Sequence, residues 1–288
     1  MCKPRVLVLG GSGCLGSAIM HELSFSGNDY LGTYSSSLID NQADIQQFRV
    51  GENVETLLAR VKPNIVINCI VNKKSGHFVP KHIKELFRTN TYFPLQLAKV
   101  SSIFNVRVIH ISTNAVFSGI KGLRRETSLP FPKTLYSSSK LLGESKLENV
   151  NNIRVSFVPK NLETAIRYNA IDWLTKASND SPVLGFENHF WNGLTEQTVA
   201  KLLCAVINNS FILEKLPHTL HLFSSKQMSK YEMCALLLKK YNLPLNHLRV
   251  SKSPKFQNLT LDSDYLDYLQ LIWQEAGFNE IPSFHDLF

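Results

Sequence analysis

Residues 9–16 read LGGSGCLG, a stretch that holds four of the chain's fourteen glycines. Its spacing satisfies both G-x-x-G-x-x-G and G-x-G-x-x-G. The apolar run at 6–9 predicts a strand that leads into this stretch, and residues 15–24 have the period of a helix. Glycines at such a strand-to-helix turn let the backbone approach a pyrophosphate, which the N–H groups of the helix N-terminus favour. The stretch predicts a dinucleotide site, although a tight turn that binds nothing shows the same pattern.

Short apolar runs alternate with segments of helical period through the first 160 residues, which predicts a parallel sheet with right-handed crossovers. Beyond residue 160 the pattern loosens, without a Gly/Ser linker. Expected strands are 5–9, 30–34, 64–71, 106–112, 153–158, 183–186 and 220–223, and expected helices are 15–24, 54–61, 81–100, 135–147, 163–176, 196–207, 230–241 and 263–275. We therefore predict an α/β fold, with a Rossmann-type doubly wound parallel sheet over residues 1–160. A smaller C-terminal α+β substrate-binding region, 161–288, is expected to pack on it and partly interleave with it.

Composition and charge narrow the classes of partner. The 288 residues are 44% hydrophobic and 19% charged, as in a globular protein with a sizeable core. Lys and Arg number 31 against 23 Asp and Glu, but they are spread as short pairs rather than collected in a tract, so we expect no nucleic-acid partner. Five separated cysteines without a C-x-x-C pair predict neither a disulfide framework nor a metal site. No apolar run approaches the ~18 residues of a membrane span, so we expect a cytoplasmic protein without a membrane partner.

The end of the second predicted strand bears on which dinucleotide binds. Residues 32–37 read GTYSSS, with no acidic residue to hold a ribose 2′-hydroxyl. Tyr34 and Ser35 therefore leave room for a 2′-phosphate, which favours NADP. The usual arginine is absent from this turn as well, so NAD stays possible. Asp44 and Ile45, placed after what reads as a third short strand, are candidates for the adenine end, although an Asp before a helix is also a common cap.

A second motif, Y-x-x-x-K at 136–140, supplies acid–base chemistry. Alone this spacing is common by chance, but here it lies on a predicted helix downstream of the glycine turn. Residues four apart share a helix face, so Tyr136 and Lys140 would face one cleft, where an ammonium group lowers the pKa of a phenol. Thr113 follows the predicted strand 106–112 and could hydrogen-bond the same substrate oxygen. Together these residues predict proton delivery to a carbonyl while its carbon receives hydride.

Taken in order, these motifs resemble the extended short-chain dehydrogenases/reductases, and among them the dTDP-4-dehydrorhamnose reductase family. The likeness covers nearly the whole chain, through NCIV at 68–71, STNAVFSG at 112–119, YSSSKLLGE at 136–144 and FWNGLT at 190–195. It implies catalytic places for Thr113, Tyr136 and Lys140, with Lys140 also on the nicotinamide ribose. The cofactor contacts that the resemblance and the turn imply are Gly10, Gly13, Cys14, Leu15 and Gly16 at the pyrophosphate, Tyr34, Ser35, Asp44 and Ile45 at the adenosine end, and Cys69, Ile70 and Val71 at the fourth strand.

The chain departs from the family at Asn114 and Ala115, where reductases commonly carry an Asp and an aromatic or small residue. A dehydratase of the superfamily would carry an Asp-Glu pair there as acid and base. The resemblance therefore implies NAD(P)H-dependent reduction of a 4-keto-6-deoxy nucleotide sugar in surface polysaccharide synthesis, with a possible homodimer. A non-catalytic NADP-binding regulatory subunit and a nucleotide-sugar 4-epimerase are the alternatives. Arg154 has two interpretations, a substrate-phosphate ligand or an internal ion pair, and Trp191 is either a stacking platform or core packing.

Overall fold

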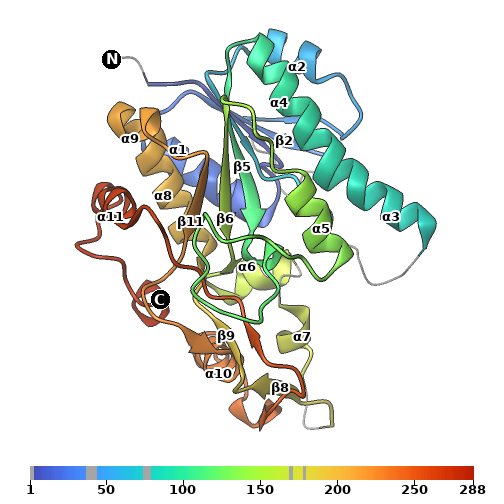
Figure 1. The fold of residues 1–288 in the computed structure, drawn as a ribbon, viewed down its shortest axis with the longest axis vertical. Coiled ribbons are helices and arrows are strands. Elements are labelled where there is room, and N and C mark those ends of the chain that lie inside the picture. The colour runs from blue at the N-terminus through green and yellow to red at the C-terminus, as the bar shows by residue number, and fades with distance from the viewer. Residues whose placement is uncertain (1–2, 37–43, 74–78, 169–170, 178–179) are drawn as a thin grey trace.

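A computed structural model of the chain describes residues 3–36, 44–73, 79–168, 171–177 and 180–288. Its centre is a parallel sheet in the order β11-β6-β5-β4-β1-β2-β3 (Figure 1). The strands are β1 (Val6–Leu9), β2 (Tyr30–Tyr34), β3 (Ile45–Gln47), β4 (Ile65–Asn68), β5 (Arg107–Thr113), β6 (Val150–Val155) and β11 (Thr219–Leu222). This order is that of a doubly wound sheet, so the predicted Rossmann-type α/β fold is confirmed.

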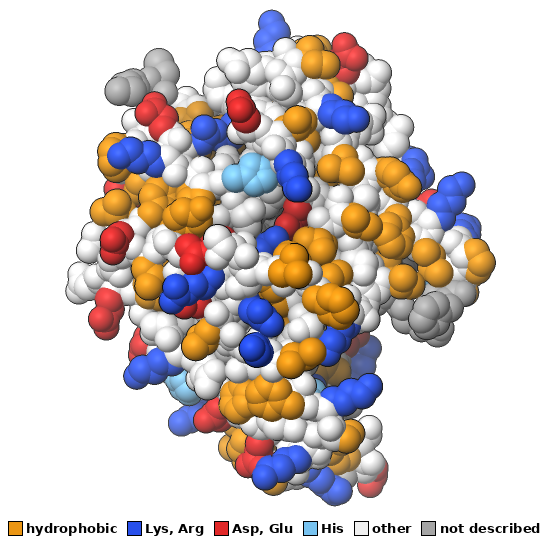
Figure 2. Space-filling view, in the orientation of Figure 1, with side chains coloured by type: hydrophobic (Ala, Val, Ile, Leu, Met, Phe, Trp, Pro, Cys, Tyr) orange, Lys and Arg blue, Asp and Glu red, His pale blue; other side chains and the backbone are white. Residues whose placement is uncertain are grey.

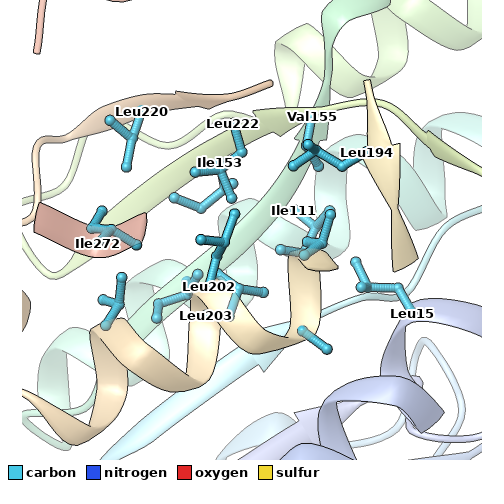
Figure 3. Close-up of a cluster of buried hydrophobic side chains, with 14 of the residues drawn as sticks. Leu15, Ile111, Ile153, Val155, Leu194, Leu202, Leu203, Leu220, Leu222 and Ile272 are labelled. Atoms are coloured by element: carbon cyan, nitrogen blue, oxygen red, sulfur yellow. The ribbon is translucent and has the colours of Figure 1, made fainter. Parts of the chain in front are cut away.

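Helices cover both faces of the sheet (Figure 1). One face carries α1 (Cys14–Phe25), α8 (Glu196–Asn208), α9 (Ser210–Glu214) and α11 (Leu266–Glu275), and the other carries α2 (Val54–Val61), α3 (Pro80–Phe87), α4 (Phe93–Ile103) and α5 (Leu135–Leu142). On the first face, Leu202 and Leu203 of α8 meet Ile153 and Leu220 of the sheet (Figure 3). Strand residues such as Leu7 and Val8 are fully buried because both faces are covered, as parallel sheets require.

The smaller elements gather beyond the carboxyl ends of the large sheet's strands (Figure 1). They include α6 (Leu162–Arg167), α7 (Asp172–Thr175), α10 (Lys230–Lys240) and three short sheets, formed by β7 (Phe157–Val158) with β10 (Leu194–Thr195), by β8 (Val183–Phe186) with β13 (Leu248–Ser251), and by β9 (His189–Trp191) with β12 (Met228–Ser229) and β14 (Gln257–Asn258). Three short 3₁₀ turns are η2 (Asn114–Val116), η3 (Leu245–His247) and η4 (Phe284–Leu287). Between these small elements the chain returns to the large sheet with α8 and β11. Residues from both sides of position 160 share one hydrophobic core, and the domain boundary at 160 stays a prediction.

Several elements differ from their sequence-based bounds. The expected helix 81–100 consists of α3, a π-helical turn η1 (Arg88–Tyr92) and α4. Pro94 lies in the first turn of α4, where its missing N–H is tolerated. The expected strand 153–158 is β6 and β7, interrupted at Ser156, and the expected helix 163–176 is split into α6 and α7. Hydrophobic periodicity identified these segments but not the breaks, which tertiary contacts decide.

Asn90 explains the π-helical turn. Its side chain is fully buried, accepts a hydrogen bond from the Asn72 backbone N–H and donates to the Asn72 carbonyl and to the Ser139 hydroxyl on α5. The backbone of this turn also approaches α5 closely, since a Cβ on Gly143 would lie 2.0 Å from the Asn90 carbonyl oxygen. The turn therefore joins α5, the loop after β4 and the α3–α4 layer around the carboxyl edge of the sheet.

The surface offers no long basic tract on the face drawn in Figure 2, where lysines and arginines are interspersed with acidic and hydrophobic side chains. Among the described residues, no helix is both long and apolar enough to cross a membrane.

We predict that Gly16→Ala lowers the free energy of unfolding by about 2 kcal/mol, because the added methyl would lie 2.1 Å from the Gly10 carbonyl oxygen. Gly13→Ala, in the same turn, is the matched control: its methyl would come no closer than 3.2 Å to that oxygen. Urea unfolding followed by circular dichroism measures both variants. Equal losses for the two would contradict the close packing of α1 against the turn.

Candidate functional site

The glycine turn connects β1 to α1 at the centre of the sheet's carboxyl edge. Gly10 adopts a φ of +79°, and its carbonyl accepts a hydrogen bond from the Gly13 N–H. Gly13 is the N-cap of α1 and brings no side chain to cap it. The first N–H groups of the helix, from Cys14 onward, have no acceptors within it. This cradle fits the pyrophosphate of a dinucleotide, because the glycine N-cap brings no side chain to the helix N-terminus.

Two adjoining cavities, of about 200 and 220 Å³, extend from this turn along the carboxyl ends of the strands. A third cavity, of about 260 Å³, lies on the outer side of α1 and is lined by Gly11 and Ser12 of the turn and by residues of α6 and α8. The two adjoining cavities share Gly13, Cys69 and Val71 in their walls. The cavity toward β5, here the catalytic cavity, is lined by Cys14, Leu15, Gly16, Thr113, Tyr136 and Lys140 among others. The cavity toward β2, here the β2 cavity, is lined by Gly10, Tyr34, Ser35 and Ile70 among others.

Three predicted catalytic residues line the catalytic cavity together. Thr113 ends β5, while Tyr136 and Lys140 lie on α5, whose first turn is fixed by a Thr134–Ser137 capping box. A hydrogen bond between the Tyr136 and Thr113 hydroxyl groups joins the phenol to the strand end. The four-residue spacing thus brings the hydroxyl groups and the amine to one site, as the helix period predicts.

Burial sets the protonation of Tyr136. It raises the pKa of the phenol above its usual value, and the hydrogen bond with Thr113 lowers the pKa in part. The expected lowering by a neighbouring ammonium group is not what the structure shows. Lys140 instead donates to the Ile111 carbonyl oxygen at 2.6 Å, on the strand behind the phenol. Tyr136 is therefore protonated at neutral pH and can act as an acid.

Lys140 is itself unusual, because only 2% of the residue is exposed. Burial lowers the pKa of its amine to about 8, against smaller opposing effects of Glu144 and Cys69. Lys73, which the sequence did not single out, lines the same cavity and lowers the pKa of the Cys14 thiol, whose burial raises it to about 12. Cys14 is thus a neutral thiol beside the turn, and Lys73 adds a positive charge next to the pyrophosphate cradle.

The β2 cavity corrects the expectation for the adenosine end. Asp44 and Ile45 do not line it; Asp44 lies directly before β3, at the amino end of the strand, where its carbonyl accepts from the Gly32 N–H. Parallel strands bind ligands at their carboxyl ends, so this position faces away from the site. Ile45 instead contributes to the cavity on the outer side of α1. The residues that follow β3, Phe48 and Val50, line the β2 cavity in their place.

Arg49, between those two residues, is a further residue at this end of the site that the sequence motifs did not indicate. Its Nε donates to the Ser35 carbonyl oxygen at 2.9 Å, which brings an exposed guanidinium group to the end of β2. The turn at the end of β2, residues 32–37, contains no arginine of its own. The pairing of β2 with β3 supplies one from 14 residues further along the chain.

Arg154 and Trp191 serve the structure. Arg154 is buried on β6 and forms a bidentate ion pair with Glu144, with distances of 2.9 and 2.7 Å. The same carboxylate accepts from Ser112, the residue before Thr113, at 2.6 Å. Trp191 donates its indole N–H to Ser156 and packs edge-on against Phe284. The ion-pair interpretation of Arg154 and the packing interpretation of Trp191 therefore hold.

Other polar groups near the strand end also have structural partners. Asn114 is buried and donates its amide to the Leu259 carbonyl oxygen at 2.9 Å, so it closes the turn after β5 against the C-terminal segment. Within the described residues, no group of three or more His, Cys, Asp or Glu side chains is arranged to hold a metal ion.

Comparison with known proteins connects this geometry to a family. The family model described as RmlD substrate binding domain matches residues 4–260. Methionine adenosyltransferase 2 subunit beta of Bos taurus is 25% identical over 291 residues, covering 92% of this chain and 82% of that protein. A dTDP-4-dehydrorhamnose reductase of Aggregatibacter actinomycetemcomitans is 27% identical over 145 residues, which cover 50% of this chain and 46% of the reductase.

A solved structure shows the same fold. The dTDP-4-dehydrorhamnose reductase of Bacillus anthracis, solved in complex with NADP, superposes with a TM-score of 0.73 at 18% identity and covers 99% of this chain and 96% of its own. The resemblance to dTDP-4-dehydrorhamnose reductases inferred from the motifs is confirmed. Because the family model runs from β1 through the Y-x-x-x-K helix and into the C-terminal part, the chain belongs to the RmlD substrate binding domain family.

Proposed function

We propose that this protein is an NADPH-dependent reductase of a 4-keto-6-deoxy nucleotide sugar, acting in surface polysaccharide synthesis. The observation that carries the proposal is the shared cavity of Thr113, Tyr136 and Lys140 beside the pyrophosphate cradle. Support for the substrate class comes from the reductases in the family, whose names specify dTDP-4-dehydrorhamnose.

In this proposal each residue has a defined task. Nicotinamide, when bound, supplies hydride to the carbonyl carbon of the sugar. Tyr136 donates its phenolic proton to the carbonyl oxygen, so that the ketone becomes an alcohol and a tyrosinate remains to be reprotonated from solvent. Thr113 hydrogen-bonds the same oxygen and orients it toward the phenol. Lys140 holds the nicotinamide ribose, and Lys73 offsets negative charge at the pyrophosphate.

Tyr136 is in the protonation state that reduction requires. Burial raises the pKa of the phenol, so its proton is present at neutral pH, whereas oxidation of an alcohol needs the tyrosinate as a base. Dehydration would need a carboxylic acid and a base after Thr113, and Asn114 and Ala115 provide neither. These features favour plain ketone reduction over the dehydratase and epimerase alternatives.

For the cofactor, we propose NADP over NAD because of Arg49. The groups that surround the end of β2 are the Ser35 hydroxyl and the Arg49 guanidinium group, with no carboxylate contributed by the turn residues 32–36. A guanidinium group pairs with phosphate through two parallel N–H bonds. The solved Bacillus anthracis reductase, which contains NADP, is consistent with this choice.

We predict that Tyr136→Phe lowers kcat by 10²-fold or more, which is about the contribution of general acid catalysis, and leaves NADPH binding intact. NADPH oxidation with a panel of keto-deoxy nucleotide sugars measures turnover, and quenching or enhancement of NADPH fluorescence measures binding. Tyr92→Phe is the control, since that tyrosine is 69% exposed on the α3–α4 layer. Undiminished turnover in the Tyr136 variant would exclude this tyrosine as the acid.

We predict that Arg49→Ala weakens NADPH binding by roughly 10- to 100-fold, the value of a hydrogen bond to a charged group, and changes NADH binding little. Titrations of both cofactors by fluorescence measure the ratio. Arg60→Ala is the matched control, because Arg60 lies on α2 and donates to Gln46 away from the β2 cavity. An unchanged NADPH-to-NADH ratio in the Arg49 variant would remove the basis for the NADP preference.

A second candidate is a non-catalytic regulatory subunit that binds NADP. The observation in its favour is the match to methionine adenosyltransferase 2 subunit beta, which runs along nine-tenths of this chain rather than half of it. Copurification with a larger enzyme, together with NADPH binding but no oxidation of NADPH by any sugar in the panel, would favour this role. A possible homodimer of the reductase form is tested by sedimentation of the purified protein.

A further inference from the structure

A directed series of hydrogen bonds lies beneath the catalytic cavity and ends at Lys140. The Ile70 backbone N–H donates to the Asn68 side-chain oxygen at 3.1 Å. The Asn68 side-chain nitrogen lies 3.2 Å from His110 Nδ1, and His110 Nε2 lies 3.4 Å from Lys140 Nζ. Asn68, His110 and Lys140 are all at least 98% buried, since their exposed fractions are 0%, 1% and 2%.

The direction of this series is set at its start. A backbone N–H can only donate, so it holds the Asn68 amide with its oxygen toward Ile70 and its NH₂ group toward His110. Nδ1 of His110 must then accept, which places the ring proton on Nε2. Flipping the amide would set two donors against each other at Ile70, in a buried place where an unpaired donor costs free energy.

His110 stays neutral in this position. Burial lowers the pKa of its imidazole well below the usual value, and the nearby Lys140 lowers it further. The ring therefore presents a fixed N–H at Nε2 to the lysine amine. An ammonium group has only donors and cannot accept from that N–H, whereas a neutral amine has a lone pair that can.

We propose that Asn68 and His110 are positioning residues: they fix the imidazole tautomer that presents its Nε2–H to the Lys140 amine, and this contact favours the neutral amine over the ammonium form. This role extends the proposed function, in which Lys140 binds the nicotinamide ribose, but the arrangement itself involves only the protein. Burial lowers the pKa of Lys140 to about 8, and the His110 N–H acts in the same direction. The ammonium form is present below that pH and is lost as the pH rises through it.

The other titratable groups near Lys140 either raise the pKa of its amine or lie further from it. Glu144, from the same helix, and Cys69, after β4, each raise the pKa of the amine, and Tyr136 lies one turn earlier on α5. The Ile111 carbonyl oxygen accepts one of the amine's hydrogens in either state. The His110 N–H is thus the contact that distinguishes the two protonation states in favour of the neutral amine.

The decisive variant is Asn68→Asp, which keeps the side-chain shape and the bond from Ile70 but replaces the NH₂ donor with an acceptor. The carboxylate can only accept, so His110 Nδ1 must carry the proton that it donates. His110 Nε2 then becomes an acceptor for Lys140, which stabilises the ammonium form. We expect the titration midpoint of Lys140 to rise by about one pH unit or more. Competitive labelling with acetic anhydride across pH, read at the Lys140 peptide by mass spectrometry, measures the midpoint without any cofactor or substrate.

The double variant with His110→Leu separates the tautomer from simple charge. If the carboxylate acts through the imidazole, the rise caused by Asn68→Asp is lost or at least halved when His110 is replaced. An equal rise in both backgrounds, or none in either, overturns the proposal. Because a buried carboxylate can impair folding, the uncharged variant Asn68→Leu is measured in parallel. Leucine has no NH₂ donor, so it no longer fixes the tautomer of His110. An unchanged titration midpoint of Lys140 in this variant would also overturn the proposal.

These outcomes are independent of the proposed reductase function. If the protein oxidises no NADPH with any sugar but shows the predicted titration midpoints of Lys140, the reductase proposal fails. The proposal for Asn68 and His110 then still holds. NADPH affinity measured against pH connects the two. It is expected to fall as the pH rises above about 8 in the wild type and above a higher pH in Asn68→Asp.

Discussion

The close approach of backbone to backbone at the glycine turn is the constraint on which the site depends. Gly16, in the first turn of α1, leaves no room for a side chain against the Gly10 carbonyl. This contact aims the N-terminus of α1 at the carboxyl edge of the sheet, between β1 and β4. Because the order of a doubly wound sheet reverses at that point, the loops on either side diverge and leave a crevice above the strand ends.

Around that crevice, burial of polar groups determines the chemistry. The phenol of Tyr136 is kept protonated, whereas the amine of Lys140 is made to lose its proton more easily, and desolvation is the main cause of both shifts. Buried charges are tolerated only where they are paired. Arg154 and Glu144 meet that condition with two short bonds, and Glu144 also accepts from Ser112, the neighbour of Thr113. The ion pair thus supports the strand end that carries Thr113.

The relatives of this chain include a protein named as a dTDP-4-dehydrorhamnose reductase and proteins named as methionine adenosyltransferase 2 subunit beta. Its likeness to methionine adenosyltransferase 2 subunit beta is the more extensive, whereas its Thr113, Tyr136 and Lys140 meet in one cavity as a reductase requires. A dinucleotide cradle alone serves either role. The reductase proposal rests on the tyrosine next to that cradle, which lines the same cavity.

The sequence by itself determined the fold class and most of the site, because both rest on local patterns. Alternating strands and helices identified the parallel sheet, glycine spacing located the turn, and the four-residue spacing of Tyr136 and Lys140 fixed their common helix face. Only the tertiary structure decided which strands become neighbours. The pairing of β3 with β2 brings Arg49 to Ser35 and puts Asp44 at the far edge, and the pairing of β4 with β5 brings Asn68 to His110. Such contacts join residues 14 and 42 positions apart, and no periodicity within one element records which distant element it will meet.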